Sequence, residues 1–542
     1  MPKVAKSQEL PINVVGSSTF GRYNRISTER TYNMMISTTD KEQWLTNFAG
    51  YQRAIEIFAV GEGRGIFASV RGNLMIVVVN SAVYRINPDL TVVFIGVITT
   101  ATGEVSIDEN LSSQIAICDG ANVYIYNWTL PPNLTVQNLL GQVPSFVSFH
   151  NSFFNIGSGI TSPNPQSWTS WAFNTNTTIQ LISTQAIQTK PDIALAVLRI
   201  PSQAANVLVL GQSVCEIFTG VGGTQNYRRV NTINVDYGCI SVSTIDSSDS
   251  YIAWLGANEK NQPVIMVYSG QGAAPISSDG IDHLMDTISF PQESTASFRK
   301  VDGHLIYQLT FYNPADNITL FYDFNLQKFF DATDQFMNYH PARNFAFFNG
   351  QSYFVSLNNG SIYQESTDIT VYNENLPGAP VNNALIYVIP RTRITENIEA
   401  DDTDRFRINR FVMPIEQGND PGFSDLSINP LNLITEDPFN PADDQLITEN
   451  GLGAIPIVNE QAGAGGPGNP YVIPYQARVD MSISIDGGIS WSNVVSRGLR
   501  AIGKRKNILT WNRLGAANIV TFRLNFYSTF RVVVNNAQME IY

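Results

Sequence analysis

A stretch near residue 500 comes close to a nucleotide-binding loop. Residues 498–505 read GLRAIGKR and match the pattern G-x-x-x-x-G-K-[ST] at every position but the last. Arg505 replaces the hydroxyl residue that would hold Mg²⁺, and no strand–helix–strand pattern surrounds the stretch. Nucleotide binding is therefore disfavoured. Two interpretations of Arg497 to Lys506 remain, a docking or phosphate-contacting surface and a solvated basic turn.

Other reactive side chains are isolated along the chain. Residues 211–215, GQSVC, miss the nucleophile elbow G-x-S-x-G at the last position. No histidine pair has the spacing of a metal-binding helix; the histidines are His150, His283, His304 and His340. The three cysteines are too widely spaced for a zinc motif and are expected to be reduced and mostly buried; they are Cys118, Cys215 and Cys239. The sequence therefore predicts no catalytic residue, no metal and no cofactor.

Residues 484–491, SIDGGISW, fit the Asp-box pattern S-x-D-x-G-x-x-W of sialidase-like propellers. In such a hairpin Asp486 accepts backbone N–H groups and Trp491 packs beneath the turn. This is a structural device, so a single copy favours β structure over sugar chemistry. A glycan-binding or sialidase-like enzyme remains the alternative function. Three aromatic residues are either a ligand platform or core residues, namely Trp168, Trp171 and Phe173.

Short runs rich in β-branched and aromatic residues alternate with tight turns, and helical periodicity is scarce. Asp119-Gly120, between residues 114–118 and 122–126, predicts a two-residue type I′ hairpin. Further hairpins are predicted around Asp302-Gly303 and Asn349-Gly350. Similar strand endings at residues 83–86 and 123–126 lie 40 residues apart, which is the period of a four-stranded propeller blade.

The fold predicted from this pattern is all-β. Residues 51–395 would form a β-propeller of roughly six to eight irregular blades, with additional β-rich N- and C-terminal segments. An array of ordinary β-sandwiches is the alternative. The other predicted divisions are an N-terminal arm at 1–50, an acidic loop or insertion rich in Pro, Gly and Asn at 396–478, and a C-terminal β segment at 479–542. That last segment either closes the propeller or forms a separate platform.

Composition sets limits on the class of protein. The chain has 542 residues, a formal net charge of -13 and 43% hydrophobic residues, so it is globular rather than disordered. Its acidity disfavours a free protein that gathers nucleic acid by neutralising phosphates. The longest aliphatic run, Leu74 to Val79, is far shorter than the roughly 20 residues of a membrane span. The first residues lack the apolar core of a secretory signal, so we expect neither a membrane-spanning segment nor secretion.

Charge is segregated towards the C-terminal end. Residues 411–477 contain no basic residue or histidine but nine acids: Glu416, Asp420, Asp425, Glu436, Asp437, Asp443, Asp444, Glu449 and Glu460. Residues 497–531 contain eight basic residues and no acid: Arg497, Arg500, Lys504, Arg505, Lys506, Arg513, Arg523 and Arg531. The first segment repels phosphate, whereas the second can attract it.

Four stretches share motifs with one protein family. They are residues 16–33, beginning GSSTFGRY; residues 61–86, followed by the 119–120 hairpin and residues 145–147; residues 210–218, continuing through 227–229 and 237–239 to 254–256; and residues 497–530, with WNRLG at 511–515. In this order they resemble the packaged-DNA stabilization proteins, also called tail hub or nozzle proteins, of short-tailed bacteriophages. The resemblance covers most of the chain except the acidic loop.

The resemblance implies a propeller subunit that assembles as a hexameric ring beneath the portal and its adaptor ring. Such a ring prolongs the DNA channel and helps to retain the packaged genome. The family has no catalytic residue to carry over and needs no cofactor. The implied partners are other copies of the chain, the head-to-tail adaptor, a tail needle, fibres or spikes, and double-stranded DNA in passage. The implied location is the virion tail, assembled in the host cytoplasm.

These expectations give the charged segments a role. We expect the acidic 411–477 segment to face the channel or its mouth. The basic side chains expected to dock on the adaptor or on a neighbouring copy are Arg497, Arg500, Lys504, Arg505, Lys506 and Arg513. Six copies would carry a formal charge of six times -13, or -78, and an acidic wall keeps a phosphate backbone from adhering. A receptor-binding spike is disfavoured, because spikes generally show trimeric β-helix repeats of shorter period.

Overall fold

The computed structural model describes residues 8–21, 29–39, 42–57, 61–131, 134–172, 181–221, 226–258, 260, 262–382, 385–399, 405–418, 446–447, 454–455, 477–499 and 506–541. The chain divides into two compact units. Unit 1 comprises Met1–Gln52, Phe330–Asn338 and Ser366–Tyr542, and unit 2 comprises Arg53–Phe329 and Tyr339–Glu365.

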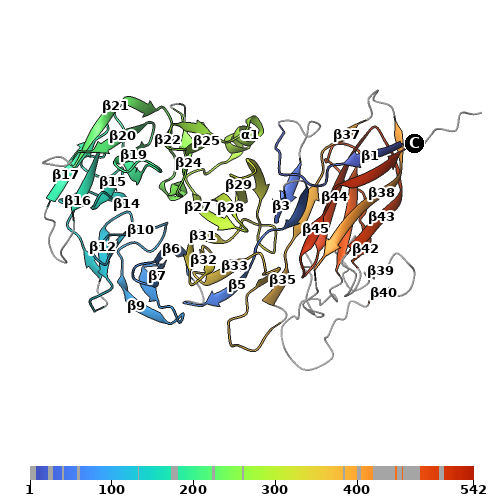
Figure 1. The fold of residues 1–542 in the computed structure, drawn as a ribbon, viewed down its shortest axis with the longest axis horizontal. Helices are drawn as coiled ribbons and strands as arrows, with labels where there is room; N and C mark the ends of the chain where they lie inside the picture. The colour runs from blue at the N-terminus through green and yellow to red at the C-terminus, as the bar shows by residue number, and fades with distance from the viewer. Residues whose placement is uncertain are drawn as a thin grey trace, which may run out of the picture. The chain divides into compact units, whose positions relative to one another are not determined.

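Six sheets built from consecutive strands follow one another through unit 2 in the described residues (Figure 1). Blade 1 is β6 (Gly63–Ser69), β7 (Leu74–Val79), β8 (Ala82–Ile86) and β9 (Val92–Val97). Blade 2 is β10 (Ser106–Glu109), β11 (Gln114–Cys118), β12 (Val123–Asn127) and β13 (Leu134–Val136). Blade 3 is β14 (Pro144–His150), β15 (Phe153–Ser158), β16 (Ser167–Ala172) and β17 (Leu181–Ala186).

The next three sheets repeat this order of strands. Blade 4 is β18 (Ala194–Arg199), β19 (Asn206–Gly211), β20 (Cys215–Gly220) and β21 (Tyr227–Val235). Blade 5 is β22 (Gly238–Cys239), β23 (Asp246–Ser247), β24 (Ile252–Ala257), β25 (Pro263–Tyr268) and β26 (Ala273–Pro275), with η1 (Val242–Thr244) within it and α1 (Asp279–Thr287) after it. Blade 6 is β27 (Ser294–Val301), β28 (His304–Phe311), β29 (Ile318–Asp323) and β30 (Lys328–Asp331).

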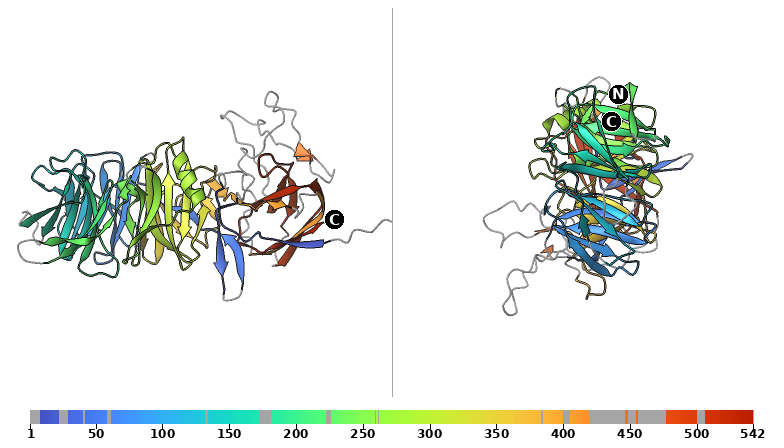
Figure 2. Two further views of the ribbon diagram at one scale, coloured as in Figure 1. Left: turned by 90° about the horizontal axis from the view of Figure 1, so that it is seen from above. Right: turned by 90° about the vertical axis from the view of Figure 1, so that its left-hand side faces the viewer.

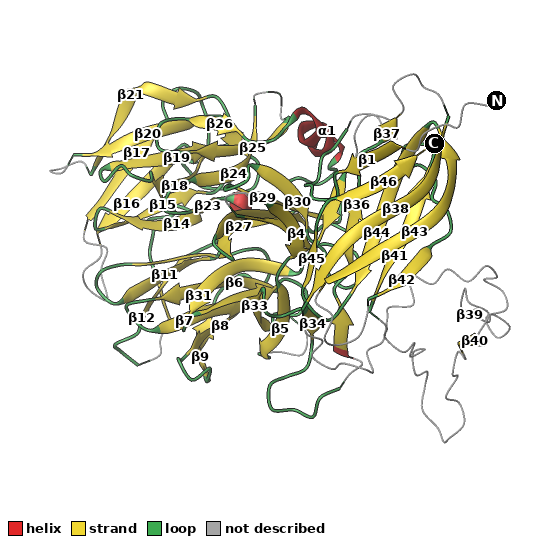
Figure 3. Cartoon of the chain, turned by 45° about the vertical axis from the view of Figure 1, so that its right-hand side comes forward, coloured by secondary structure: helices red, strands yellow, loops and turns green. Residues whose placement is uncertain are grey.

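A seventh sheet joins distant parts of the sequence. Blade 7 contains β31 (Ala342–Phe348), β32 (Gln351–Ser356) and β33 (Ile362–Ser366), and β5 (Gly50–Ile55) lies next to β33. Strand β6 contacts both β10 and β31, so blade 1 lies between blades 2 and 7 and the ring of sheets is closed (Figure 1). The prediction of an all-β propeller with roughly six to eight blades is therefore confirmed. Strands dominate the chain, as Figure 3 shows.

Strand β7 explains the longest aliphatic run in the sequence. Successive side chains of a strand point to opposite faces, so a strand packed on both faces must be apolar at every position. Leu74, Ile76 and Val78 pack in a cluster with residues of blade 2. The alternate residues pack in a cluster with blade 7; they are Met75, Val77 and Val79.

The predicted hairpins are present, but one turn differs from its prediction. Asp302 and Gly303 both have positive φ angles and connect the pair Val301 and His304, as a two-residue type I′ turn requires. At Asp119 only the following Gly120 has a positive φ, of 82°. The Asp119 carboxylate instead accepts the N–H groups of Ala121 and Asn122, at 3.0 and 2.7 Å, so the loop has four residues. The type I′ assignment there was wrong, because an Asx turn satisfies the backbone instead.

Unit 1 contains two larger β-sheets (Figures 1 and 2). The first has the order β1 (Gln8–Ile12), β46 (Ala537–Ile541), β38 (Phe406–Gln417), β45 (Val532–Val534), β4 (Gln43–Asn47) and β3 (Met34–Thr38), with β43 (Lys506–Ala517) paired to β38. The second has the order β2 (Arg30–Tyr32), β36 (Arg391–Ile394), β44 (Ile519–Tyr527), β41 (Arg478–Ser484) and β42 (Val495–Gly498), with β37 (Ile398–Glu399) paired to β44.

The two sheets pack through aromatic side chains. The Phe411 ring of β38 lies 4.6 Å from the Phe522 ring of β44 and 5.8 Å from the Trp511 ring, measured between ring centroids. Two further strands, β34 (Val371–Asn373) and β35 (Ile386–Val388), pair with each other, and β34 also pairs with residues 51–52. A short hairpin of β39 (Leu446–Ile447) and β40 (Ala454–Ile455) lies within the predicted acidic loop.

Candidate functional site

Only part of the predicted docking and channel surfaces belongs to the described residues. Arg497, Lys506, Arg513 and Glu416 are described. Outside the described residues lie three of the predicted docking residues, Arg500, Lys504 and Arg505, and eight of the predicted channel acids, Asp420, Asp425, Glu436, Asp437, Asp443, Asp444, Glu449 and Glu460.

The described basic residues are engaged with their own unit. The Arg497 guanidinium donates through Nε to the Thr510 carbonyl, at 2.8 Å, and through Nη1 to the Ser496 carbonyl. Lys506 Nζ lies 3.1 Å from Glu416 Oε1. Arg513 of β43 is exposed and has a positive φ angle of 59°. Gly515, two residues later in the same strand, also has a positive φ angle, of 97°. The three residues thus have different environments rather than one shared cluster.

Two contacts join described residues of the two charged segments within unit 1. Strand β38 ends at Gln417, inside the acidic segment 411–477, and Glu416 pairs in register with Lys506, the first residue of β43. On the other sheet, Leu499 N–H donates to the Ala477 carbonyl at 2.8 Å. Glu416 and Ala477 of the acidic segment therefore adjoin Lys506 and Leu499 of the basic segment 497–531.

The sequence motifs with a structural interpretation behave as expected. Asp486 accepts the N–H groups of Ile489 and Ser490, at 3.0 and 2.9 Å, as an Asp-box turn should. These donors and the neighbouring hydroxyls hold the pKa of Asp486 well below its usual range. Trp168 and Trp171 are 0% and 1% exposed and belong to hydrophobic clusters, which settles the choice in favour of core residues. Phe173 lies outside the described residues.

The cysteines are buried thiols, as predicted. Burial raises the pKa of Cys118 and of Cys239 to about 12 and that of Cys215 well above its usual value. A raised pKa lowers the thiolate fraction at neutral pH, so these groups are inert.

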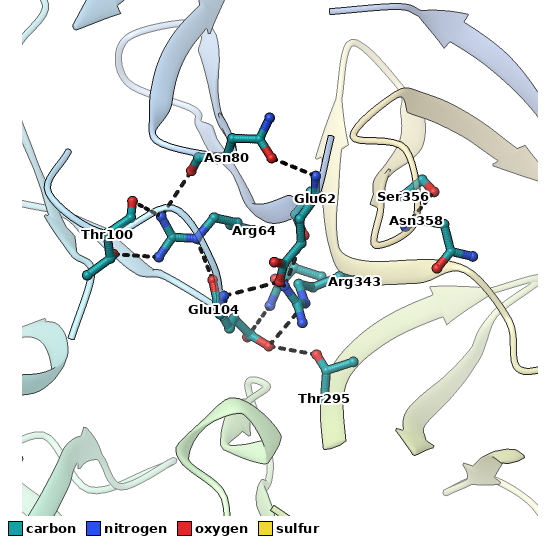
Figure 4. Close-up of polar contacts among 12 residues, drawn as sticks. Glu62, Arg64, Asn80, Thr100, Glu104, Thr295, Arg343, Ser356 and Asn358 are labelled. Atoms are coloured by element: carbon teal, nitrogen blue, oxygen red, sulfur yellow. Dashed lines mark hydrogen bonds and ion pairs between the residues drawn. The ribbon is translucent and has the colours of Figure 1, made fainter. Parts of the chain in front are cut away.

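A network of charged side chains that no motif indicated lies at the centre of the propeller (Figure 4). Arg64 of β6 is fully buried and makes hydrogen bonds to three backbone carbonyls, of Gly103 at 2.5 Å, Asn80 at 3.0 Å and Thr100 at 2.7 Å. It also donates to Thr100 Oγ1 at 2.8 Å. One guanidinium therefore fixes the loop before β10 against blade 1.

Arg343 of β31 extends the network to blade 7. Its Nη1 lies 2.6 Å from Glu62 Oε1, and its Nε lies 3.9 Å from Glu104 Oε2. Glu62 also accepts the Gly103 N–H at 3.1 Å. A guanidinium that is 1% exposed thus contacts carboxylates from the entries of blades 1 and 2. Breaking such a pair is costly because it leaves a buried charge uncompensated.

Glu104 reaches across the centre to blade 6. Thr295 Oγ1 of β27 donates to Glu104 Oε2 at 2.6 Å, and Asn344 Nδ2 donates to Glu104 Oε1 at 2.9 Å. Burial raises the pKa of Glu104 to about 7, although the Arg343 charge and these hydrogen bonds act in the opposite direction. The entry of blade 2 is therefore tied through one carboxylate to the innermost strand of blade 6, a blade that is not its neighbour, as Figure 4 shows.

Two more carboxylates connect neighbouring blades through hydrogen bonds. Asp108 of β10 accepts the Phe149 N–H of β14 at 2.6 Å, and Asp246 of β23 accepts the Phe298 N–H of β27 at 2.7 Å. Burial raises the pKa of Asp108 to about 7 and of Asp246 to about 6. Each carboxylate accepts a hydrogen bond from a backbone N–H group on the innermost strand of the next blade. In a regular ladder a backbone carbonyl of a paired strand would be the acceptor. The sequence did not predict these two carboxylates as connections between blades, because a single acidic residue forms no recognisable motif.

The third family stretch forms a comparable connection in blade 4. The Glu216 side chain is fully buried and its Oε2 lies 2.9 Å from Arg229 Nε. Its Oε1 accepts the N–H groups of Gln188 and Thr189, at 2.9 and 2.6 Å. The carboxylate therefore holds the chain that leads into blade 4 against β20.

The first family stretch is anchored in unit 1. Arg30 Nη2 lies 2.6 Å from Asp331 Oδ1, and Ser18 Oγ donates to Asp331 Oδ2. The fully buried Arg393 donates to the carbonyls of Val14 and Ser17, at 2.9 and 3.0 Å, and pairs with Glu29. The buried guanidinium thus fixes the described part of the N-terminal segment through several acceptors.

The charged groups described here are structural connections. In the described part of the chain no group of three or more His, Cys, Asp or Glu residues could hold a metal ion. None of the helices found there has the length and apolar character to cross a bilayer. The fold is a β-propeller with a second β-rich unit. Buried ion pairs at the centre of the propeller connect its blades.

Comparison with known families then identifies the chain. The family described as bacteriophage P22 Gp10, β-propeller, matches residues 23–369, which is more than half of the 542 residues. The chain belongs to this family, and it is a phage structural protein. The match includes the stretches that contain Arg30, Glu62, Arg64 and Glu216.

Other comparisons add only fold-level likeness. No curated protein sequence matches the chain. Among solved structures, a virginiamycin B lyase from Staphylococcus aureus has a TM-score of 0.40 at 10% identity and covers 59% of this chain and 99% of its own. A streptogramin B lyase has a TM-score of 0.39 at 9% identity, with 59% and 97% covered. BamB from Moraxella catarrhalis has a TM-score of 0.35 at 7% identity, with 65% and 97% covered. These likenesses are too distant to carry an argument.

Proposed function

We propose that this protein is a tail hub or nozzle subunit of a short-tailed phage. In this role it assembles as a ring, most simply a hexamer, below the portal and its adaptor, lengthens the DNA channel and retains the packaged genome. Its partners are other copies of the chain, the adaptor, and a tail needle, fibres or spikes. It acts without catalysis, in the virion tail, after assembly in the host cytoplasm.

The observation that carries this proposal is the contact between Thr295 and Glu104 at the propeller centre. A hydrogen bond of 2.6 Å joins the innermost strand of blade 6 to the entry of blade 2. A DNA duplex is wider than its major groove, which alone is about 12 Å across. A duplex therefore cannot pass through a propeller whose side chains are in contact at its centre. A conduit made of this chain must therefore enclose DNA between several copies, each of which acts as a solid block of the wall.

The charge distribution supports the same proposal. Six copies at -13 each carry -78, which disfavours adhesion of the DNA backbone to the wall. In our proposal the acidic 411–477 segment faces the channel or its mouth, and the basic residues between Arg497 and Arg513 contact the adaptor or a neighbouring copy. Because described residues of the two segments adjoin, both contacts would be made by neighbouring parts of unit 1.

Electron microscopy of the purified full chain, alone and with its candidate adaptor, tests the assembly. Rings that bind the adaptor are expected. Particles that remain single copies and hydrolyse a fluorogenic sialoside would refute the hub and favour the propeller enzyme. In assembled virions, neutralising the nine acids of the 411–477 segment should change the rate of genome release and its salt dependence. Unchanged release kinetics over a range of salt would remove the channel role of that segment while leaving the ring intact.

A further inference from the structure

The outermost strands of blades 1 and 2 expose apolar side chains. Strand β9 ends the sheet of blade 1, as Figure 1 shows, and β13 ends that of blade 2, so neither is hydrogen-bonded to a second strand within the described residues. On β9, Val92, Phe94 and Val97 are 40%, 54% and 64% exposed, and on β13, Val136 is 57% exposed. We call these four residues, with the two strands that carry them, the rim of blades 1 and 2.

The two strands of the rim adjoin each other. A Cβ atom at Gly96 of β9 would lie 3.2 Å from the Leu134 side chain of β13, and Leu134 packs against the cluster that joins the two blades. Single exposed apolar residues are common on protein surfaces, whereas an apolar patch that spans neighbouring elements marks an interaction site. Neither strand contains a charged residue or a proline, which commonly keep a free sheet edge from pairing with another chain.

The part of the chain that carries the rim has no exposed charge. Residues 90–189 contain no Lys or Arg, and residues 120–189 contain no Asp or Glu either, although 15% of the whole chain is charged. Four acidic residues lie between 90 and 119, and none of them is exposed: Glu104, Asp108, Glu109 and Asp119. Every exposed side chain that the structure describes from residue 90 to residue 189 is therefore neutral.

This neutrality indicates which partner fits the rim. DNA and other highly charged partners are bound through charges of opposite sign, and the rim offers none. Two copies of this chain, each with a formal charge of -13, repel each other, and the repulsion is weakest where the surfaces in contact are neutral. The cores of protein interfaces are likewise depleted in charged residues and enriched in aromatic ones. A second copy of the chain is therefore the partner that the rim suits.

We propose that a neighbouring copy of the chain covers the rim of blades 1 and 2 in the assembled ring. The rim contacts a different face of the neighbour, because a face that paired with itself would stop at a dimer. Phe94 is the aromatic anchor of this contact, since its ring already packs edge-on against Tyr84, with 5.6 Å between centroids. The inference rests on the proposed function and specifies which surface of the propeller joins the copies.

Phe94→Lys tests the contact in the full chain with its candidate adaptor present. A charge at the anchor should raise the concentration at which rings form by about tenfold or more, measured by mass photometry and electron microscopy. Phe347→Lys is the matched control, because Phe347 of β31 is 70% exposed and lies outside the rim. The inference is overturned if Phe94→Lys forms rings at the same concentration as the unaltered chain, or if both variants weaken the rings equally.

Hydrogen–deuterium exchange of the unaltered chain is a second test that needs no variant. The backbone N–H groups of β9 and β13 should exchange more slowly in rings than in single copies. Protection that appears only after the adaptor binds would assign the rim to the adaptor and overturn the inference. Rings in which both strands stay unprotected would overturn this inference alone, whereas a chain that forms no ring at any concentration would overturn the proposed function with it.

Discussion

Lys506 and Glu416 face each other across the antiparallel pair of β38 and β43, with 3.1 Å between Nζ and Oε1. Each residue belongs to a different charged segment of the sequence, one basic and one acidic. Both side chains are exposed, at 84% and 46%, so the pair itself contributes roughly 0–1 kcal/mol to stability. The importance of the pair is geometric, because it holds a residue of the acidic segment against a residue of the basic segment.

The Lys506→Gln variant tests whether Lys506 contributes to adaptor binding without contributing to the stability of unit 1. The free energy of unfolding of unit 1 should change by less than about 1 kcal/mol, measured by urea denaturation. Binding to the candidate adaptor should weaken and become less sensitive to salt, because one charge of the proposed docking surface is lost. Lys300→Gln, at an exposed lysine of unit 2, is the matched control. Equal adaptor affinity for both variants at low salt would contradict a docking role for Lys506.

Arg343→Met removes the cation that lies between Glu62 and Glu104. The free energy of unfolding of unit 2 should fall by about 3–5 kcal/mol, because the buried Glu104 and the partly exposed Glu62 both lose their cationic partner. Chemical denaturation followed by tryptophan fluorescence measures the change. The double variant Arg343→Met with Glu104→Gln should recover part of the loss, since the second change removes one uncompensated charge. No recovery would mean that Glu104 is not coupled to Arg343.

Glu104→Gln should change how stability depends on pH. Because the pKa of Glu104 is raised to about 7 in the folded protein, its contribution to stability is fully present below its unfolded pKa near 4.5 and is lost as the pH rises through 7. Relative to the unaltered protein, the Glu104→Gln variant should therefore become more stable as the pH increases from 5 to 8. Melting temperatures across that range measure the effect.

Two comparisons sharpen the pH experiment. Glu56→Gln, at an exposed acid of unit 2, is the matched control for the loss of one carboxylate. The buried His340 acts in the opposite sense, since burial lowers its pKa well below the usual value and its contribution is lost as the pH falls below about 6.5. A constant difference between Glu104→Gln and the unaltered protein at every pH would show that Glu104 does not titrate in this range.

Gly238→Ala tests the close approach of blade 5 to blade 4. A Cβ atom at Gly238 would lie 2.0 Å from the Gln212 carbonyl oxygen, which belongs to the backbone and cannot rotate away. Such overpacking should cost about 1–3 kcal/mol and lower the melting temperature of unit 2. Gly272→Ala is the matched control, because nothing lies within 4 Å of its added Cβ. Equal melting temperatures for the two variants would show that β22 can shift freely.

The sequence was most informative where structure is local. Asn349-Gly350 and Asp302-Gly303 predicted two-residue hairpins, since the φ angles of such turns depend on the turn residues themselves. The Asp119 turn differed because its side chain competes for the backbone N–H groups. The pairing of β5 with β33 was not predictable, since more than 300 residues separate the strands and no local pattern records their register.

The site was harder to predict than the fold for a related reason. Glu104, Asp108 and Asp246 each act alone on a different blade, and only the ring of sheets brings their partners close. Their neighbours in the sequence form no catalytic or metal-binding pattern. The near match to a nucleotide-binding loop, by contrast, was visible in the sequence but has no supporting structure in the described strands that flank it, which are β42 and β43.

The use of β5 in blade 7 has a consequence for biosynthesis. During translation the ribosome makes β5 and blade 1 early, yet β31, β32 and β33 of blade 7 are made only after residue 341. Until then Met75, Val77 and Val79 of β7 have no blade 7 to cover them. A nascent chain must therefore carry this apolar surface exposed through most of its synthesis, which makes it a client for chaperones and sensitive to truncation before its last blade.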